Sequence, residues 1–384
     1  MSEQPARPYI GGQAVIEGVM MRSPSSFAIV CRRQSGELVV REQPMTSPIT
    51  TGPRTWPFVR GVVTVVESLR LGSRALRWSA ELFEQDLEAA ERAKTAEGAK
   101  AGVATAATRK SSAGIGTALA LSMTALVTQE PDGAPPAPAP DKKGSGALGI
   151  FSILFAIALF VALPQAGAEG INRLLGLGLE VTSPGYQAIT GVAKLLIVVG
   201  YMVGIRQIPE VRRVFQYHGA EHKAITTYEA REPLEVEYAK AKTTLHARCG
   251  TTFLVMVALV SIVMFSLLGA SLPKIPGGRL LESIGFFFMK LPFLPIIAAM
   301  TYEIQRVFAR YCTTGPLRAL LWPGFLVQKI TTAEPEDEQL EIALASLRAT
   351  LWREEAVAAP VQPDRTFSSY GELLADPGYA AARA

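Results

Sequence analysis

The sequence has few cysteines and few charged residues for its length. Of its 384 residues, 3 are Cys and only 19% are charged, whereas 49% are hydrophobic. Three isolated cysteines, at Cys31, Cys249 and Cys312, exclude a disulfide framework and favour a reducing compartment. The low charge and high hydrophobic content exclude an intrinsically disordered chain. A membrane protein with soluble parts is the class that fits this composition.

Concentrated basic charge is also missing. The 38 Lys and Arg residues are spread along the chain and nearly balanced by 34 Asp and Glu, which leaves a net charge of +4. Binding to a phosphate backbone requires a basic face, so nucleic acid is not expected as a partner. The first 25 residues lack the continuous apolar core of a secretory signal. The N-terminus is therefore expected to start in the cytosol.

Long apolar stretches are what the chain does have. A bilayer is crossed by about 20 helical residues, with a lower limit of roughly 17. Four stretches approach this length: residues 147–163, 188–205, 251–270, and a fourth within 284–307 that is interrupted by a lysine and two prolines. The sequence thus predicts a mainly α-helical integral membrane protein with about four transmembrane helices and the lipid bilayer as its partner.

The orientation of these spans follows from where Lys and Arg fall in the connections. Residues 206–250 contain eight basic residues, whereas residues 164–187 contain only Arg173 and residues 271–283 only Lys274 and Arg279. This distribution predicts a multi-pass protein of the cell (inner) membrane, with residues 206–250 and both termini in the cytosol. Residues 147–310 would form the membrane domain.

The chain before the first span divides into two parts. Residues 9–40 show short apolar runs separated by turns, which predicts a small β-rich cytosolic element at the N-terminus within residues 1–91. An amphipathic helix over residues 56–84 follows; it either packs on this element or lies on the membrane surface. Residues 92–146 are rich in Ala, Gly and Pro, which predicts a disordered tether.

The chain after the last span is expected to be cytosolic. Residues 311–384 form this C-terminal segment, and residues 336–356 carry Leu and Ile at helical spacing. The pattern predicts an amphipathic helix that docks on the cytosolic body.

All three histidines of the chain lie in the connection 206–250, together with one cysteine. His218 and His222 are four residues apart and share one face of a helix. His246 and Cys249 are separated by two residues, a spacing found in zinc sites with paired ligands. These nitrogen and sulfur donors favour Zn²⁺ or another divalent transition metal. The sequence therefore predicts a metal site made of these four residues.

The order His-x-x-Glu-His at residues 218–222 is also the inverted zincin pattern. In that pattern the two histidines hold zinc, and the glutamate, here Glu221, is the general base toward a water. Such enzymes take a further acidic ligand from downstream, and Glu303 at the cytosolic end of the fourth span is the candidate. The alternative for Glu303 is a salt bridge to Arg306 on the same helix.

The motifs that surround these residues resemble the YqhQ-like family, bacterial membrane proteins described as predicted metal-dependent enzymes of unknown function. They read GGQAVIEGVMMR at residues 11–22, FQYHGAEHKAITTYE at 215–229, LHARCGTTF at 245–253 and PGFLVQKITTAEP at 323–335. The resemblance covers most of the chain outside residues 94–146 and the tail after about residue 355. It implies a metal and a membrane, and it supplies no substrate.

Two functions remain open from the sequence. The first is a metal-dependent hydrolase at the cytosolic membrane face, with Glu221 as base. The second is a non-enzymatic membrane protein in which His218, His222, His246 and Cys249 close a structural zinc site. Transport is weaker, because only Lys194 and Lys290 are ionisable well inside the spans. The residues indicate neither a substrate nor an oligomeric state.

The orientation can be tested with a reporter inserted within residues 231–240. The basic residues of the 206–250 connection predict that a reporter active only in the cytosol will be active there. The same reporter placed in residues 164–187 is the matched control and should be inactive. An external signal from residues 231–240 would contradict both the orientation and a cytosolic site.

Overall fold

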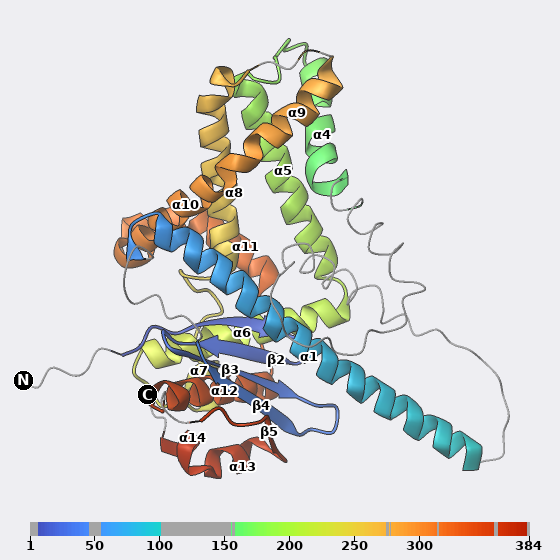
Figure 1. Cartoon of the computed structure of the whole chain (residues 1–384), viewed down its shortest axis with the longest axis vertical. Helices are drawn as coiled ribbons and strands as arrows, with labels where there is room; N and C mark the ends of the chain where they lie inside the picture. Colours follow the sequence, from blue (N-terminus) through green and yellow to red (C-terminus); the bar gives the residue numbers. More distant parts are fainter. Residues whose placement is uncertain are drawn as a thin grey trace, which may run out of the picture.

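The computed structural model describes residues 7–45, 55–100, 155, 158–273, 276, 278–312, 315–356 and 360–381. It shows a bundle of long apolar helices standing on a domain built around a β-sheet (Figure 1). We call the bundle end next to the sheet the proximal end and the opposite end the distal end.

The sheet contains five antiparallel strands in the order β1-β2-β3-β4-β5. The first four confirm the predicted N-terminal β-rich element: β1 (Gly11–Val15), β2 (Gly18–Arg22), β3 (Ser26–Arg32) and β4 (Leu38–Pro44). The fifth, β5 (Arg365–Phe367), comes from the C-terminal tail and pairs with β4, with Leu38 opposite Phe367. The C-terminal tail therefore completes the N-terminal sheet.

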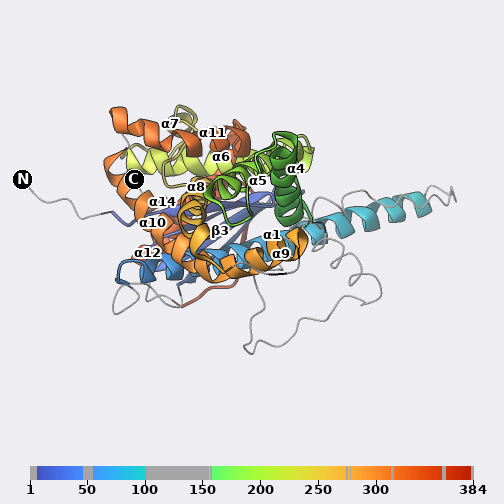
Figure 2. The same cartoon turned by 90° about the horizontal axis from the view of Figure 1, so that it is seen from above.

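Side chains on successive strand positions point to opposite sides of the sheet, and helices cover both sides. One face, with Met20 and Ile29, packs on Leu71, Ala75 and Trp78 of helix α1 (Val59–Lys100). Along this stretch α1 therefore packs on the β element, which was one of the two arrangements that the sequence allowed; the other was a position on the membrane surface. Its C-terminal half extends beyond the body of the protein (Figures 1 and 2).

The opposite face of the sheet covers the largest core of the domain. It packs on helices α6 (Pro209–Glu229), α7 (Val236–Lys240) and α12 (Asp337–Glu355), and on the small helices α13 (Tyr370–Ala375) and α14 (Pro377–Ala381). The domain is thus a three-layer arrangement of helix, sheet and helices, assembled from the two ends of the chain and the connection between two long apolar helices.

Helix α12 confirms the predicted C-terminal helix but is buried far more than an amphipathic surface helix. Of its 19 residues, 13 are buried, including the polar Ser346 and Thr350. Their hydroxyls donate hydrogen bonds to main-chain oxygens of the sheet, Ser346 to Ala28 and Thr350 to Met21. The helix begins with a capping box between Glu336 and Gln339. Helix α12 is therefore the central helix of the domain.

Within the described residues, three helical segments are long and apolar enough to cross a membrane: α5 (Pro184–Ile205), α8 (Gly250–Leu268) and the combined segment Leu281–Tyr311. They correspond to the second, third and fourth predicted spans. The larger part of the first predicted span, residues 147–154, 156 and 157, lies outside the described residues. Its last residues continue as η2 (Ala158–Ala162) into α4 (Leu163–Leu174), which packs on α5.

The fourth predicted span is one apolar segment that contains two helices. Helix α9 (Arg279–Lys290) is followed by a 3₁₀ turn, η4 (Leu291–Phe293), and then by α10 (Leu294–Tyr311). Pro292 and Pro295 lack the N–H that an uninterrupted α-helix needs, so the series of main-chain hydrogen bonds is interrupted here. A short 3₁₀ helix, η3 (Gly269–Ser271), precedes this segment, and η5 (Pro316–Leu321) and α11 (Trp322–Thr331) follow it.

The predicted tether at residues 92–146 falls mostly outside the described residues. Its first part does not: helix α1 continues to Lys100, past the predicted start at residue 92. The sequence from residue 84 to 94 is rich in Ala, Glu and Lys/Arg, which are strong helix formers, and this explains the longer helix.

The central position of α12 predicts a large loss of stability on truncation of its core side chains. Leu344 is 0% exposed, so Leu344→Ala should lower the free energy of unfolding by about 2–5 kcal/mol through lost burial and a residual cavity. Val361→Ala, at a residue that is 54% exposed, is the control. Unfolding of both variants in detergent should separate them clearly. Equal stability would show that α12 is peripheral.

Candidate metal centre

Two helices bring three of the predicted ligands together. His218 and His222 project from the same side of α6, and Cys249 is the residue that caps the N-terminus of α8. One donor atom from each of these residues lies within 4.8 Å of the other two. The Nε2 atom of His218 is 3.2 Å from the Sγ atom of Cys249. The structure therefore joins a helix of the sheet domain to the first turn of an apolar helix at this point.

The outer nitrogens of both histidines are held by main-chain carbonyls. Nδ1 of His218 lies 2.9 Å from the carbonyl oxygen of Thr331, and Nδ1 of His222 lies 2.5 Å from that of Thr244. A carbonyl only accepts, so both Nδ1 atoms carry hydrogen. In a neutral ring the lone pair is then on Nε2. This is how histidines that bind metals are usually oriented.

His222 leaves a buried nitrogen without a partner. The residue is 1% exposed, and its Nε2 atom has no hydrogen-bond partner in the described part of the chain. Buried polar atoms are almost always paired, and leaving one unpaired costs about 1–3 kcal/mol. A metal ion bound by His218, His222 and Cys249 would satisfy this nitrogen. The donor set therefore fits a metal such as zinc.

Cys249 lies in an environment that favours the thiolate. Burial raises its pKa, but the neighbouring His218 and His222 outweigh burial and hold the pKa of the thiol well below its usual range. The Sγ atom also accepts a hydrogen bond from the backbone N–H of Thr251, at 3.4 Å. For His218, burial lowers the pKa, but Cys249 raises it to about 9. The two groups stabilise each other's charged forms.

His246 lies beside the group and does not join it. Its ring centre is 5.6 Å from that of His222, and its Nε2 atom is 3.5 Å from Oε2 of Glu229. Burial lowers the pKa of His246 and so favours the neutral ring. Three of the four predicted His and Cys ligands thus converge, and the fourth faces a carboxylate.

Glu221 is buried at the contact between α6 and the sheet. It is 5% exposed, and it packs against Gly12 of β1, where a Cβ atom would lie 2.8 Å from the Glu221 Cγ atom. Burial raises the pKa of Glu221, against the lowering effect of His218 and His222. The sheet therefore needs a glycine at position 12 to leave room for this carboxylate.

Glu303 is not part of the group, in contrast to its predicted role as a ligand. Its Oε1 atom accepts hydrogen bonds from Nε of Arg60 at 2.8 Å and from the backbone N–H of Phe58 at 3.2 Å. Both donors belong to the start of α1 or the residue before it, so Glu303 fastens α1 to α10. The hydrogen-bonded partner is Arg60, because α1 runs across α10 here and Gly61 allows a close approach to Tyr302. Arg306, the partner that the helix spacing offered, acts on Glu303 through its charge.

Several residues that hold the site were missed by the sequence analysis. Gln328 binds both main-chain groups of His246: it accepts from the N–H at 2.8 Å and donates to the carbonyl at 2.7 Å. Thr244 and Thr331 hold the histidines through carbonyls, which any residue type provides. For Gln328 and Gly12, the signal was their place inside the motifs at residues 323–335 and 11–22.

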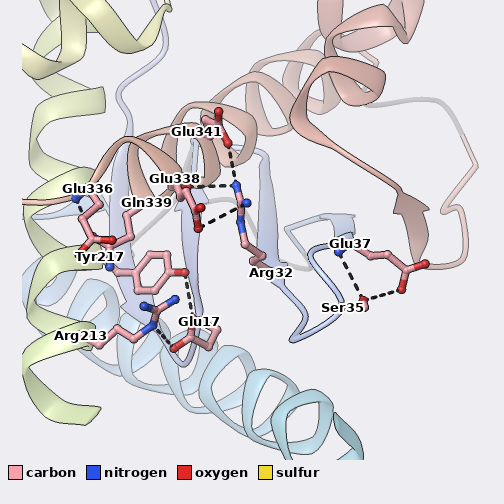
Figure 3. A network of polar contacts seen from close by, with 10 residues as sticks. All are labelled: Glu17, Arg32, Ser35, Glu37, Arg213, Tyr217, Glu336, Glu338, Gln339 and Glu341. Atoms are coloured by element: carbon pink, nitrogen blue, oxygen red, sulfur yellow. Dashed lines mark hydrogen bonds and ion pairs between the residues drawn. The ribbon is translucent and has the colours of Figure 1, made fainter. Parts of the chain in front are cut away.

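A polar network fixes the start of α6 against the sheet (Figure 3). Glu17, in the turn between β1 and β2, accepts hydrogen bonds from Nε of Arg213 at 2.5 Å and from the hydroxyl of Tyr217 at 3.2 Å. Glu17 has a positive φ of 51°, as the tight turn to Gly18 requires. Tyr217 immediately precedes His218, so the turn sets the position of the first histidine along α6.

The chain belongs to the DUF1385 family, which is described as a protein family of unknown function and which matches residues 56–353. The matched residues include α6, α8 and α11. The chain is also similar to the uncharacterized protein YqhQ of Bacillus subtilis strain 168, with 27% identity over 353 residues that cover 91% of this chain and 95% of that protein. The resemblance to a YqhQ-like family is thus confirmed. No solved structure matches.

Gln328 should be essential for the order of the loop that carries His246. It is 0% exposed, and Gln328→Ala leaves the N–H of His246 without its partner, at about 1–3 kcal/mol, and leaves the His246 carbonyl with the 3.4 Å contact from the Cys249 N–H. We expect faster amide hydrogen exchange at residues 245–250 in this variant. Gln216→Ala removes two long contacts, one to the carbonyl of Glu334 at 3.4 Å and one from the Gln339 amide at 3.3 Å, and should leave the exchange at residues 245–250 unchanged. Equal exchange in both variants would contradict this role.

Proposed function

We propose that this protein is a membrane-bound metal-dependent enzyme, a hydrolase that works at the cytosolic face. The observation that carries the proposal is the buried, unpartnered Nε2 atom of His222, which lies in one group with His218 and Cys249. The carbonyl contacts at both Nδ1 atoms support it, because they direct the lone pair of each neutral ring to Nε2.

The donors favour Zn²⁺ or another divalent transition metal. Two imidazole nitrogens and one thiolate are borderline-soft ligands, whereas Mg²⁺ and Ca²⁺ prefer oxygen. When bound, such an ion supplies a Lewis acid and lowers the pKa of a water molecule. His218, His222 and Cys249 would hold it.

An open site is supported by the direction of His246. A catalytic zinc site has three protein ligands and keeps one position for water or substrate, whereas a structural site is closed by four. Here Nε2 of His246 lies near the Glu229 carboxylate, which leaves the group with three protein donors. Three donors are the number that a hydrolytic centre needs.

Glu221 is the residue that we assign as general base. Its carboxylate lies next to His218 and His222, and burial raises its pKa above the usual range of a glutamate. A carboxylate beside the donor group is placed to accept a proton from a water molecule there. In the proposed reaction, Glu221 takes a proton from the attacking water and passes it to the leaving group. Gly12 and the sheet keep bulk water away from this carboxylate.

The alternative is a non-enzymatic membrane protein with a structural zinc site. The observation that favours it is the closeness of His246, whose ring centre lies 5.6 Å from that of His222 and which could become the fourth ligand after a rotation of its side chain. In that case the site would fasten α6 to α8, and Glu221 would have no required chemical role.

The cytosolic face and the inner membrane are proposed from the charge distribution. The sheet domain contains the connection 206–250 with its eight basic residues, and the first residues of α8 lie directly at the donor group. The centre would then lie in the cytosol, just beneath the lipid.

Metal analysis of variants separates the two functions. We expect purified wild-type protein to contain zinc, and His218→Ala, His222→Ala or Cys249→Ala to lose most of it, because three donors do not tolerate the loss of one. His246→Ala should retain metal if the site is open and lose it if the site is closed. Atomic absorption on each purified variant is the measurement.

Glu221→Gln tests catalysis directly. The amide cannot accept a proton, so this variant should keep its zinc and lose hydrolysis of a panel of p-nitrophenyl carboxylate and phosphate esters. Glu210→Gln, at an exposed position in the first turn of the same helix, is the matched control. Full activity of Glu221→Gln would exclude its role as base, and full zinc content in the His218→Ala/His222→Ala variant would exclude the centre itself.

A further inference from the structure

Helix α11 carries two stripes of residues on opposite sides. Trp322, Leu326 and Lys329 follow the i, i+4, i+7 spacing of one helix face, and all three are exposed. We call these residues the outer stripe. Gly324, Gln328 and Thr331 follow the same spacing on the other side, and all three are buried. We call these residues the inner stripe.

The inner stripe holds the metal centre. Gly324 packs on Thr252 of α8 so closely that a side chain at position 324 would clash. Gln328 binds the main chain of His246 and donates a hydrogen bond to the Thr252 hydroxyl at 2.5 Å, and the carbonyl of Thr331 accepts from His218. Because both stripes lie on one helix, a surface that binds the outer stripe also holds the residues that position the site.

The outer stripe continues into an exposed apolar surface on η5. Leu317 and Leu320 are 53% and 46% exposed, and Trp322 and Leu326 are 53% and 52% exposed. Two cations lie on the rings of this segment: Arg318 is 5.8 Å from the centre of the Phe325 ring, and Lys329 is 5.8 Å from that of Trp322. Large apolar side chains, a tryptophan and flanking cations are typical of helices that lie in a membrane interface.

The position of this segment points to the bilayer as its partner. It follows the proximal end of α10 after a short connection, and α11 packs on the apolar helices α5 and α8 (Figure 1). Tyr311, which ends α10, is 62% exposed and carries Arg310 on its ring. With ten residues, α11 is about 15 Å long, half of what is needed to cross the hydrocarbon core. It can lie in the surface but cannot span.

We propose that η5 and α11 form a non-spanning interfacial element, and that the metal centre takes its substrate from this surface as a membrane-borne amphiphile with an anionic headgroup. The bilayer would contact the outer stripe, and Arg318 and Lys329 match the charge of anionic lipids. The inner stripe, and with it the donor group, lies one helix diameter away, about 10 Å. The statement about substrate rests on the proposed function; the statement about the surface does not.

The depth of Trp322 tests the surface. A protein with Trp322 as its single tryptophan, made by Trp56→Phe, Trp78→Phe and Trp352→Phe, is reconstituted in vesicles of phosphatidylcholine and phosphatidylglycerol. We expect brominated lipids to quench its fluorescence strongly and aqueous acrylamide to quench it weakly. The matched protein that keeps only Trp352, which packs on Tyr379 in the sheet domain, should not respond to brominated lipids.

Quenching of Trp322 by acrylamide, with no more response to brominated lipids than Trp352 shows, would overturn the interfacial element. Unchanged unfolding temperatures confirm that each single-tryptophan protein is folded. If Trp78→Phe destabilises the sheet domain, the wild-type protein and its Trp322→Phe variant are compared instead, and the lost quenching is assigned to Trp322.

The substrate class is tested with Co²⁺-loaded protein, whose thiolate absorption reports on Cys249. We expect phosphatidic acid in mixed micelles to change this absorption, and phosphatidylcholine or inorganic phosphate to leave it unchanged. Arg318→Gln/Lys329→Gln should weaken the response to phosphatidic acid about tenfold, as expected for the loss of charge-assisted contacts. Lys240→Gln, which breaks an exposed ion pair with Asp337, should have no effect.

The Co²⁺–thiolate absorption distinguishes a failure of the metal centre from a failure of the membrane-borne substrate. A missing Co²⁺–thiolate absorption would contradict the metal centre itself. A normal absorption that phosphatidic acid does not change, or that inorganic phosphate changes equally, would overturn the membrane-borne substrate and leave the centre in place.

Discussion

The close approach of residues 331–333 to helix α6 determines how the two parts of the molecule meet. At Gly219 a side chain would clash with the carbonyl of Ala333, so the missing Cβ lets this segment lie directly on α6. The Ala333 N–H donates to the carbonyl of Phe215 at 2.9 Å, and one turn further along, the Thr331 carbonyl reaches His218. The contact orders the first histidine and anchors the end of α11 at once.

The same contact starts the C-terminal part of the sheet domain. After its contact with α6 at Ala333, the chain passes Pro335 and enters α12 through the capping box of that helix. Lys223 of α6 is 2% exposed and forms an ion pair with Glu334 in this passage, and its ammonium also donates to the carbonyl of Lys240 at 2.9 Å. Because α12 then packs on the sheet beside α6, the core of the domain depends on a segment that comes after all the apolar helices.

Sequence patterns predicted the elements whose signal is local. The strands of the motif at residues 11–22, the helix after residue 336 and the apolar helices α5 and α8 are each specified by their own residues. Pairing of β5 with β4 was not predictable, because a three-residue strand has no periodicity of its own. The extent of burial of α12 was also missed, since Ser346 and Thr350 read as polar positions until their carbonyl partners are known.

In the site, too, the features with a local sequence signal were predictable and those set by distant residues were not. The i, i+4 spacing places His218 and His222 on one face of α6, and their joining with Cys249 was predicted from the concentration of histidines in one connection. The placement of Glu303 depends instead on α1, which comes from far away in the chain and supplies Arg60. The direction of His246 depends on Gln328, which is 82 residues downstream. Contacts of this kind leave no spacing in the sequence that could reveal them.

The electrostatics of the donor group hold its side chains together without a metal. Without a metal, a thiolate on Cys249 and an imidazolium on His218 attract each other at 3.2 Å, between the lowered pKa of the thiol and the raised pKa of the imidazole, about 9. On the proposed function, His218 would give up its proton to hold a divalent ion, because the ligand must be a neutral ring. Positive charge is present beside the thiolate in both forms. The carbonyls of Thr331 and Thr244 hold the two rings, so the donors would need little rearrangement to bind an ion.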